Sequence, residues 1–180
     1  MLLRTIFLFT IMILPVTAFG QAMALKDKGF VMTTMKAPWI MTIGAVGFKI
    51  TQEKISPDGA RAYFLMENDK TNVIASVFIE PAVKCKTSKE CRDMVLSAGN
   101  PNWVNPINKV SSEIGIVSYF EFLMPSFQGH PVQQQNMYAE FVENGYWVDL
   151  HISKILYRKE DRPLFENLVK SVKFDAKPKL

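Results

Sequence analysis

Apolar and polar residues alternate with a period of two along most of the chain, and two segments follow the period of a helix instead. Because turn residues separate the alternating segments at short intervals, they predict antiparallel strands. We expect strands over residues 39–43, 48–56, 61–67, 73–80, 114–124, 132–142 and 146–156, with a loop over 125–131. The strand over 73–80 is apolar on both faces, which predicts an interior position in the sheet.

The two helical segments have clear boundaries. The first helix is expected over residues 88–98, since Thr87 and Glu90 have the spacing of a capping box and Gly99 provides a C-terminal stop. The second is expected over residues 162–172, with a proline in its first turn. Their apolar stripes consist of Cys91, Met94, Val95 and Ala98, and of Phe165, Leu168, Val169 and Val172.

The last two strands form the clearest hairpin. Asn144-Gly145 is the preferred pair for a two-residue type I′ turn, and it sets Glu140 opposite Asp149. Alternation then divides the hairpin into two faces. The apolar face carries Met137, Ala139, Phe141, Val148, Leu150 and Ile152, and is expected in the core. The polar face carries the candidate binding residues Asn136, Tyr138, Glu140, Trp147, Asp149, His151 and Ser153.

Two carboxylates directly opposite each other should repel. Water, a Lys or Arg, a shared proton or a cation would have to relieve the repulsion between Glu140 and Asp149. The cluster is therefore either a ligand site, or an exposed polar face or buried hydrogen-bond network beneath the second helix. Contact of His151 with either carboxylate would favour the charged imidazole.

The N-terminus has the pattern of a secretory signal peptide. Arg4 precedes a short apolar run over residues 5–16, and small residues follow. Cleavage after Gly20, Ala22 or Ala24 fits this pattern, and an uncleaved anchor is the alternative. We expect a signal peptide over residues 1–22, a single domain over 23–180 with no further transmembrane segment, and a periplasmic or secreted location.

Cys85 and Cys91 are the only cysteines and lie at the start of the first helix, in CKTSKEC. In an oxidising compartment, such a pair predicts a structural disulfide. A redox-active pair is the alternative, but this spacing differs from the C-x2-C of thioredoxin-like proteins.

Charge and motifs narrow the function. The formal charge is +4, but basic residues alternate with acidic ones, which argues against nucleic-acid binding. Hydrolase, zinc-protease and phosphate-loop motifs are missing, and the histidines are His130, in a loop, and His151. We therefore expect no catalytic residues, metal or cofactor. Met32, Met35 and Met41 suggest copper binding as an alternative to a role in the core.

The order of the elements, and the ending GYWVDLHISKILYRKEDRPLFENLVKSVKF, resemble the PsbP-like fold. This resemblance implies an α+β domain in which two main helices pack on an antiparallel β-sheet. Members of this fold are mostly accessory or partner-binding proteins and rarely enzymes, so the resemblance also implies an accessory or partner-binding function.

Two functions remain. The first is an exported, non-enzymatic accessory or partner-binding protein, for example of the immunity or inhibitor type, which binds a protein partner or a small ligand in the periplasm. The second is a small periplasmic metal-binding protein or hydrolase that uses Glu140, Asp149 and His151, because carboxylates and imidazole serve as acid–base groups and as metal ligands. The absence of catalytic motifs favours the first.

Overall fold

A computed structural model describes residues 22–25, 28–99 and 105–177, so the predicted signal peptide lies almost entirely outside the described residues. The strands are β1 Ala22–Leu25, β2 Gly29–Met32, β3 Trp39–Ile43, β4 Lys49–Ile55, β5 Ala62–Asn68, β6 Val73–Pro81, β7 Ile107–Ile114, β8 Val117–Phe127, β9 His130–Glu143, β10 Tyr146–Lys154 and β11 Lys173–Ala176. The helices are α1 Ser88–Ala98 and α2 Arg162–Ser171, and the 3-10 turn η1 Lys159–Asp161 precedes α2.

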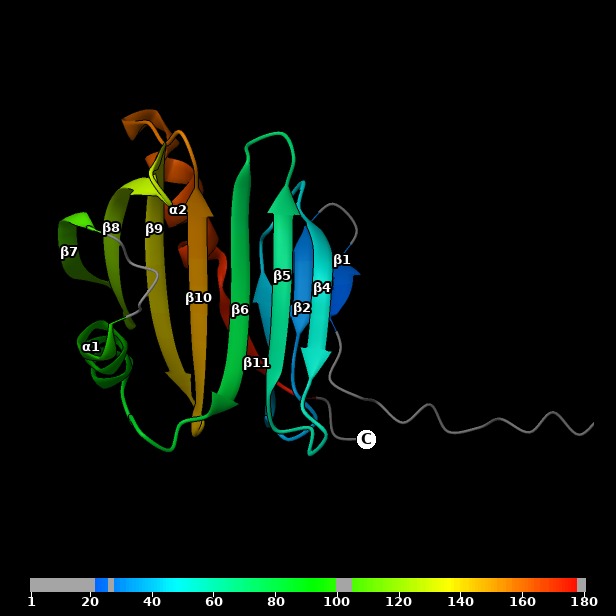
Figure 1. Cartoon of the computed structure of the whole chain (residues 1–180). Helices are drawn as coiled ribbons and strands as arrows, with labels where there is room; N and C mark the ends of the chain where they lie inside the picture. Colours follow the sequence, from blue (N-terminus) through cyan, green and yellow to red (C-terminus); the bar gives the residue numbers. More distant parts are fainter. Residues whose placement is uncertain (1–21, 26–27, 100–104, 178–180) are drawn as a thin grey trace, which may run out of the picture.

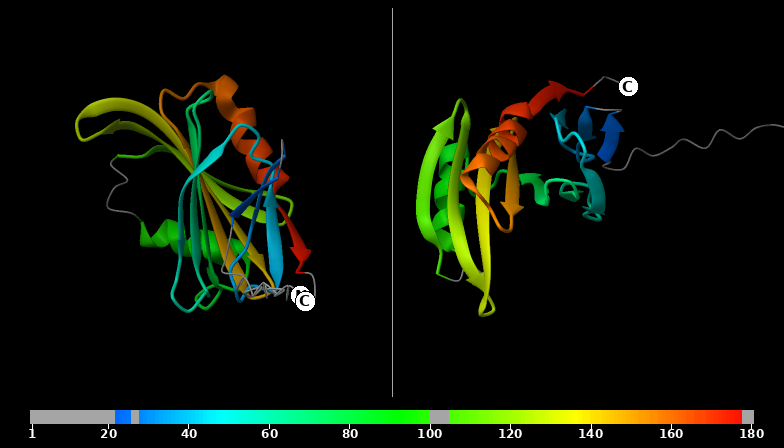
Figure 2. Two further views of the ribbon diagram at one scale, coloured as in Figure 1. Left: turned by 90° about the vertical axis from the view of Figure 1, so that its right-hand side faces the viewer. Right: turned by 90° about the horizontal axis from the view of Figure 1, so that it is seen from above.

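The strands form two antiparallel sheets (Figure 1). The large sheet has seven strands in the order β4-β5-β6-β10-β9-β8-β7, and the small sheet has four in the order β1-β2-β3-β11. Seen from the side, the large sheet stands between α1 on one face and α2 with the small sheet on the other (Figure 2). The predicted α+β class with two helices is therefore confirmed, and the small sheet is an addition to it.

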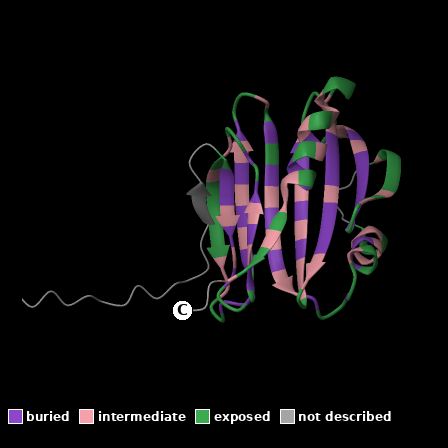
Figure 3. Ribbon diagram, turned by 180° about the vertical axis from the view of Figure 1, so that it is seen from behind, coloured by how far each residue is buried: buried purple, intermediate pink, exposed green. Residues whose placement is uncertain are grey.

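The main core lies between the large sheet, α2 and the small sheet. Alternate residues of β5, β6, β9 and β10 are buried there, and the outer side of α2 is exposed (Figure 3). Trp39 of β3 connects the two sheets, because its Nε1 donates to the backbone oxygen of Glu143 at 2.9 Å. The same indole packs edge-on against Phe174 of β11, with ring centroids 4.9 Å apart. Strands β3 and β11, which are far apart in the sequence, thus both pack over the apolar face of the β9–β10 hairpin.

Polar contacts hold α2 against the large sheet. Arg162, its first residue, forms an ion pair with Glu121, a buried residue of β8. Gln135 of β9 also donates to this carboxylate, at 3.1 Å. The partners satisfy a charge that would otherwise be costly to bury.

The expected helix α1 is confirmed at both ends. Glu90 N donates to the Thr87 hydroxyl at 3.2 Å, and Gly99 has the positive φ of 64° that ends the helix. The Glu90 carboxylate accepts from Lys86 N, one residue earlier than a capping box requires. The predicted stripe is wrong at Ala98, which is exposed, because Arg92 and Leu96 face the sheet instead.

Two further expectations need correction, and four strands are additional. The strand expected over 114–124 begins at Val117, because the chain turns at Gly115, where φ is 63°. The loop expected over 125–131 is a tight turn at Gln128 and Gly129, since Pro125 is accommodated at a bulge in β8. Strands β1, β2, β7 and β11 were not expected.

Cys85 and Cys91 are joined by a disulfide, with their Cα atoms 5.1 Å apart. The predicted pairing is therefore present, and both residues are buried. The bridge attaches the segment after β6 to the first turn of α1.

We expect replacement of both cysteines with serine to lower the free energy of unfolding by about 2 kcal/mol, because the closed loop is short. Urea unfolding at constant pH measures this change. Free-thiol labelling of the unreduced wild-type protein should detect no thiol, and two reactive thiols would contradict a structural disulfide.

Strand β1 helps to choose among the three possible cleavage sites of the predicted signal peptide. All four of its residues pair with β2, from Ala22 opposite Met32 to Leu25 opposite Gly29. Cleavage after Ala22 or Ala24 would remove one or three of these residues. We therefore expect cleavage after Gly20, and the intact mass of the exported protein should correspond to a chain that begins at Gln21. A mature chain that begins at Leu25 would show that β1 is dispensable.

Candidate functional site

The predicted register of the last hairpin is confirmed at every pair, including Glu140 opposite Asp149 and Tyr138 opposite His151. All seven candidate residues therefore lie on one face of the large sheet, opposite to α2. The helix on this face is α1, not the second helix as one alternative supposed. It packs mainly on β8 and β9, where Val95 and Leu96 contact the cluster of Phe120, Phe122, Met124 and Tyr138. Its Arg92 also donates to the backbone oxygen of Ser112 in β7.

The centre of the site is the carboxyl pair Glu140 and Asp149. Glu140 is 0% exposed, and its Oε2 accepts a hydrogen bond of 2.6 Å from Trp147 Nε1. Within the part of the chain that the structure describes, Glu140 Oε1 and Asp149 Oδ1 are both buried without a hydrogen-bond partner. Such atoms are rare in folded proteins and need an explanation.

A proton held between the two carboxyl groups would supply this explanation. Burial and the nearby Asp149 raise the pKa of Glu140 well above its usual range, although the bond from Trp147 opposes the shift. Burial raises the pKa of Asp149 to about 7. Because neither unpartnered oxygen reaches solvent, a proton is the cation that fits there without rearrangement. Of the expected ways to relieve the repulsion, the geometry favours this one.

His151 does not contact the carboxyl pair. Its ring stacks on Tyr138 with centroids 4.1 Å apart, and Tyr138 in turn stacks on Phe120 at 4.9 Å. Its Nε2 lies 3.1 Å from Asn136 Oδ1, which assigns the proton to Nε2 because an amide oxygen can only accept. Burial lowers the pKa of His151 to about 4. The imidazole is thus neutral between pH 5 and 8. A charged imidazole was expected only if His151 contacted Glu140 or Asp149, and it contacts neither.

The remaining candidates have distinct surroundings. Asn136 is buried, and its Oδ1 also accepts from Gln134 Nε2 at 2.9 Å. Trp147 lies beside Cys85 and Glu80 at the other end of β10, and Ser153 lies towards the β5–β6 turn. The seven residues therefore form two contact groups, the carboxyl pair with Trp147 and the His151 stack with Asn136, and Ser153 belongs to neither.

Beside these residues, part of the same face is uncovered by any described helix (Figure 1). The register places large side chains of three neighbouring strands there, and most are half-buried. We call this surface the open face, and it consists of Tyr63, Leu65, Ile74, Phe78 and Trp147. Ile74 is 45% exposed. Only Trp147 was expected from the sequence, although the apolar residues on both faces of 73–80 were a signal.

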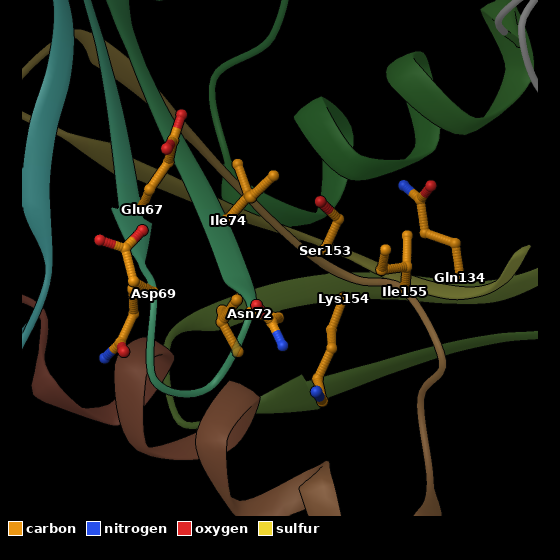
Figure 4. A pocket seen from close by; sticks show the side chains of 10 residues that line it. Glu67, Asp69, Asn72, Ile74, Gln134, Ser153, Lys154 and Ile155 are labelled. Atoms are coloured by element: carbon orange, nitrogen blue, oxygen red, sulfur yellow. The ribbon is translucent and has the colours of Figure 1, made fainter.

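A pocket of about 240 Å³ lies at one end of the open face. Glu67 and Asp69 lie on one side of it, Gln134 and Ile155 on the other, and Ile74 and Ser153 lie between them (Figure 4). This pocket joins Ser153, a candidate from the hairpin, to residues of β5 and β6 that are distant in the sequence.

Other expected or alternative sites receive little support. The described residues contain no group of three His, Cys, Asp or Glu side chains placed to hold a metal ion. Met32 and Met41 are buried in the core, whereas Met35 is 47% exposed, so the three thioethers do not share one environment. In the described ranges, no helix combines the length and apolar character needed to cross a membrane.

The raised pKa of Asp149 makes stability depend on pH. An acid whose pKa is raised on folding loses stability as the pH increases towards its folded pKa. The lowered pKa of His151 acts in the opposite direction, mostly below pH 7, because the unfolded imidazole loses its proton around its usual pKa of 6.5. From pH 6.5 to 8, we therefore expect the free energy of unfolding to fall by about 0.5 kcal/mol.

Asp149→Asn should reduce this fall, and Asp175→Asn, at an exposed carboxyl of β11, should leave it unchanged. Urea unfolding of the three proteins at several pH values measures the difference. The same pH dependence in wild type and Asp149→Asn would contradict a protonated pair.

The chain is similar in fold to solved structures. The chain matches no protein-family model and no curated protein. It is similar to the solution structure of cyanobacterial PsbP (CyanoP) from Synechocystis sp. PCC 6803, with 15% sequence identity and a TM-score of 0.44. The match covers 89% of this chain and 96% of that chain, and it is to the family whose fold the sequence resembles.

Proposed function

We propose that this chain is an exported, non-enzymatic binding protein, and that a protein partner docks on the open face. The observation that carries the proposal is the large sheet itself, because α1 covers β8 and β9 and leaves the side chains of β5, β6 and β10 accessible. Inhibitor or immunity proteins are examples of this functional class.

The composition of the open face supports a protein partner. Tyr63 and Trp147 combine flat apolar area with a polar end, as residues at protein interfaces do. Leu65, Ile74 and Phe78 add apolar area on the neighbouring strands. Apolar side chains that gather on adjacent strands of one uncovered face, rather than lying singly, are typical of interaction sites.

Export is supported by two independent features. The N-terminal sequence has the three regions of a signal peptide, and Cys85 and Cys91 are positioned to form a disulfide. Disulfides persist in oxidising compartments and are rare in the cytosol. The periplasm is the compartment that we propose.

The geometry of the carboxyl pair argues against the hydrolase alternative. The unpartnered oxygens of Glu140 and Asp149 are closed to solvent, and the His151 ring is fixed by Tyr138 and Asn136. These three side chains do not line the surface pockets of about 180, 240, 280 and 380 Å³ on the described residues. A substrate would therefore not meet all three groups together.

A photo-crosslinking side chain at position 63 should capture the partner in the exported fraction of the native cell, where mass spectrometry identifies it. The same group at position 116 is the control, because Ile116 is 77% exposed in the turn between β7 and β8. With the purified partner, Ile74→Arg should weaken binding about tenfold or more, and Ile116→Arg should not. Circular dichroism verifies folding.

Equal capture from positions 63 and 116 would contradict the proposed surface, as would equal affinity of the two Arg variants. Turnover of any substrate by the wild-type protein that is lost in Asp149→Asn would instead support the hydrolase alternative.

A further inference from the structure

We propose that the pocket between Glu67, Ile74 and Ser153 receives the side chain of a Lys or Arg from the protein partner. This inference rests on the proposed function for the source of the side chain. The ligand class, an alkyl chain with a cationic end, follows from the pocket.

The size of the pocket limits the occupant. Its volume of about 240 Å³ is below the range of about 300–1,000 Å³ that small-molecule and cofactor sites occupy. It is larger than the cavity of about 150 Å³ that holds a benzene molecule. One long side chain fits this space, whereas a nucleotide or an organic cofactor would extend beyond it.

One side of the pocket carries a hydroxyl that has no hydrogen-bond partner among the described residues. It belongs to Ser153, which is 8% exposed. Figure 4 shows this hydroxyl between Ile74 and the Gln134 amide, on the side of the pocket. This hydroxyl opens into the pocket, where it can accept a hydrogen bond from a polar occupant.

The walls match an alkyl cation. Ile74 is 45% and Ile155 is 51% exposed, and these side chains offer apolar contact to an alkyl stem. Glu67 lies at one side of the pocket, where its Oε1 accepts from the Thr51 hydroxyl at 3.1 Å. Asp69 lies on the same side and pairs with Lys49 at 2.7 Å, in a bridge whose partners are both mostly exposed. The acidic side is therefore not fully neutralised.

The lysine that lines the pocket is directed elsewhere. The Nζ atom of Lys154 donates to the backbone oxygen of Thr71 at 2.8 Å and lies 3.9 Å from Asp161 Oδ2. Alternation along β10 places Lys154 opposite to Ser153, towards η1 and α2 (Figure 4). It thus does not compete with a cation for Glu67.

The test uses the isotope-labelled mature protein and four probes of similar chain length, which are n-butylguanidinium, n-butylammonium, n-butanol and butyrate. Both cations should shift the NMR resonances of Ile74, Ser153 and Ile155 saturably, with dissociation constants at least about threefold below those of butanol and butyrate.

Glu67→Gln should weaken the binding of both cations about threefold and leave the binding of butanol unchanged. Glu113→Gln, an exposed carboxyl on β7, should alter neither. Ser153→Leu should fill the pocket and weaken every probe, and the remaining resonances report whether this variant is folded.

Equal binding of butanol and the cations would overturn the proposal, as would tighter binding of butyrate, shifts outside the pocket, or no saturable shift for any probe. The proposed function fails separately, in the crosslinking from position 63. If the partner is captured there but Glu67→Gln binds it as wild type does, the open face is retained and the cationic occupant is excluded.

Discussion

The two-residue turn Asn144–Gly145 is the constraint on which the large sheet depends. Both residues have positive φ, 46° and 78°, which asparagine and glycine adopt at lower cost than other residues. The turn pairs β9 with β10 in a single register. A shift of one residue would move Phe141, Val148 and Leu150 to the outer face and bury Glu140 and Asp149 against α2. The polar residues of the hairpin therefore contribute to register, because the wrong register is costly.

The two faces of the sheet meet different neighbours. On the core face, α2 and the small sheet cover β5, β6, β9 and β10, and Trp39 ties the small sheet to the end of β9. On the other face, the only described helix is α1, which the Cys85–Cys91 bridge holds over β8 and β9. The open face is the part of the sheet that α1 does not reach. The site thus arises from incomplete coverage of a wide sheet by one short helix.

The sequence predicts local elements and the hairpin register well, because turn and cap residues act over a few positions. Thr87, Gly99 and Asn144 are examples, and each ends or begins the element expected of it. Strands β2, β7 and β11 escape detection, because their pairing partners rather than their own patterns define them. Of the candidate site, the carboxyl pair is visible from one hairpin. The open face and the pocket are not, since β5 and β6 join β10 only in the folded sheet.

The carboxyl pair and the binding surface have separate physical roles, although they are neighbours. Glu140 and Asp149 turn their unpartnered oxygens away from solvent, so a partner on the open face would not form a direct bond with those atoms. Their raised pKa values come mainly from burial, which means that the pair lowers stability when both groups ionise. Well-packed apolar residues at these positions would often be at least as stable. What the pair does provide is a polar layer beneath Trp147, which the bond from Nε1 to Glu140 holds in one orientation. A fixed indole loses less side-chain freedom when a partner binds, and this preorganisation favours affinity at the open face.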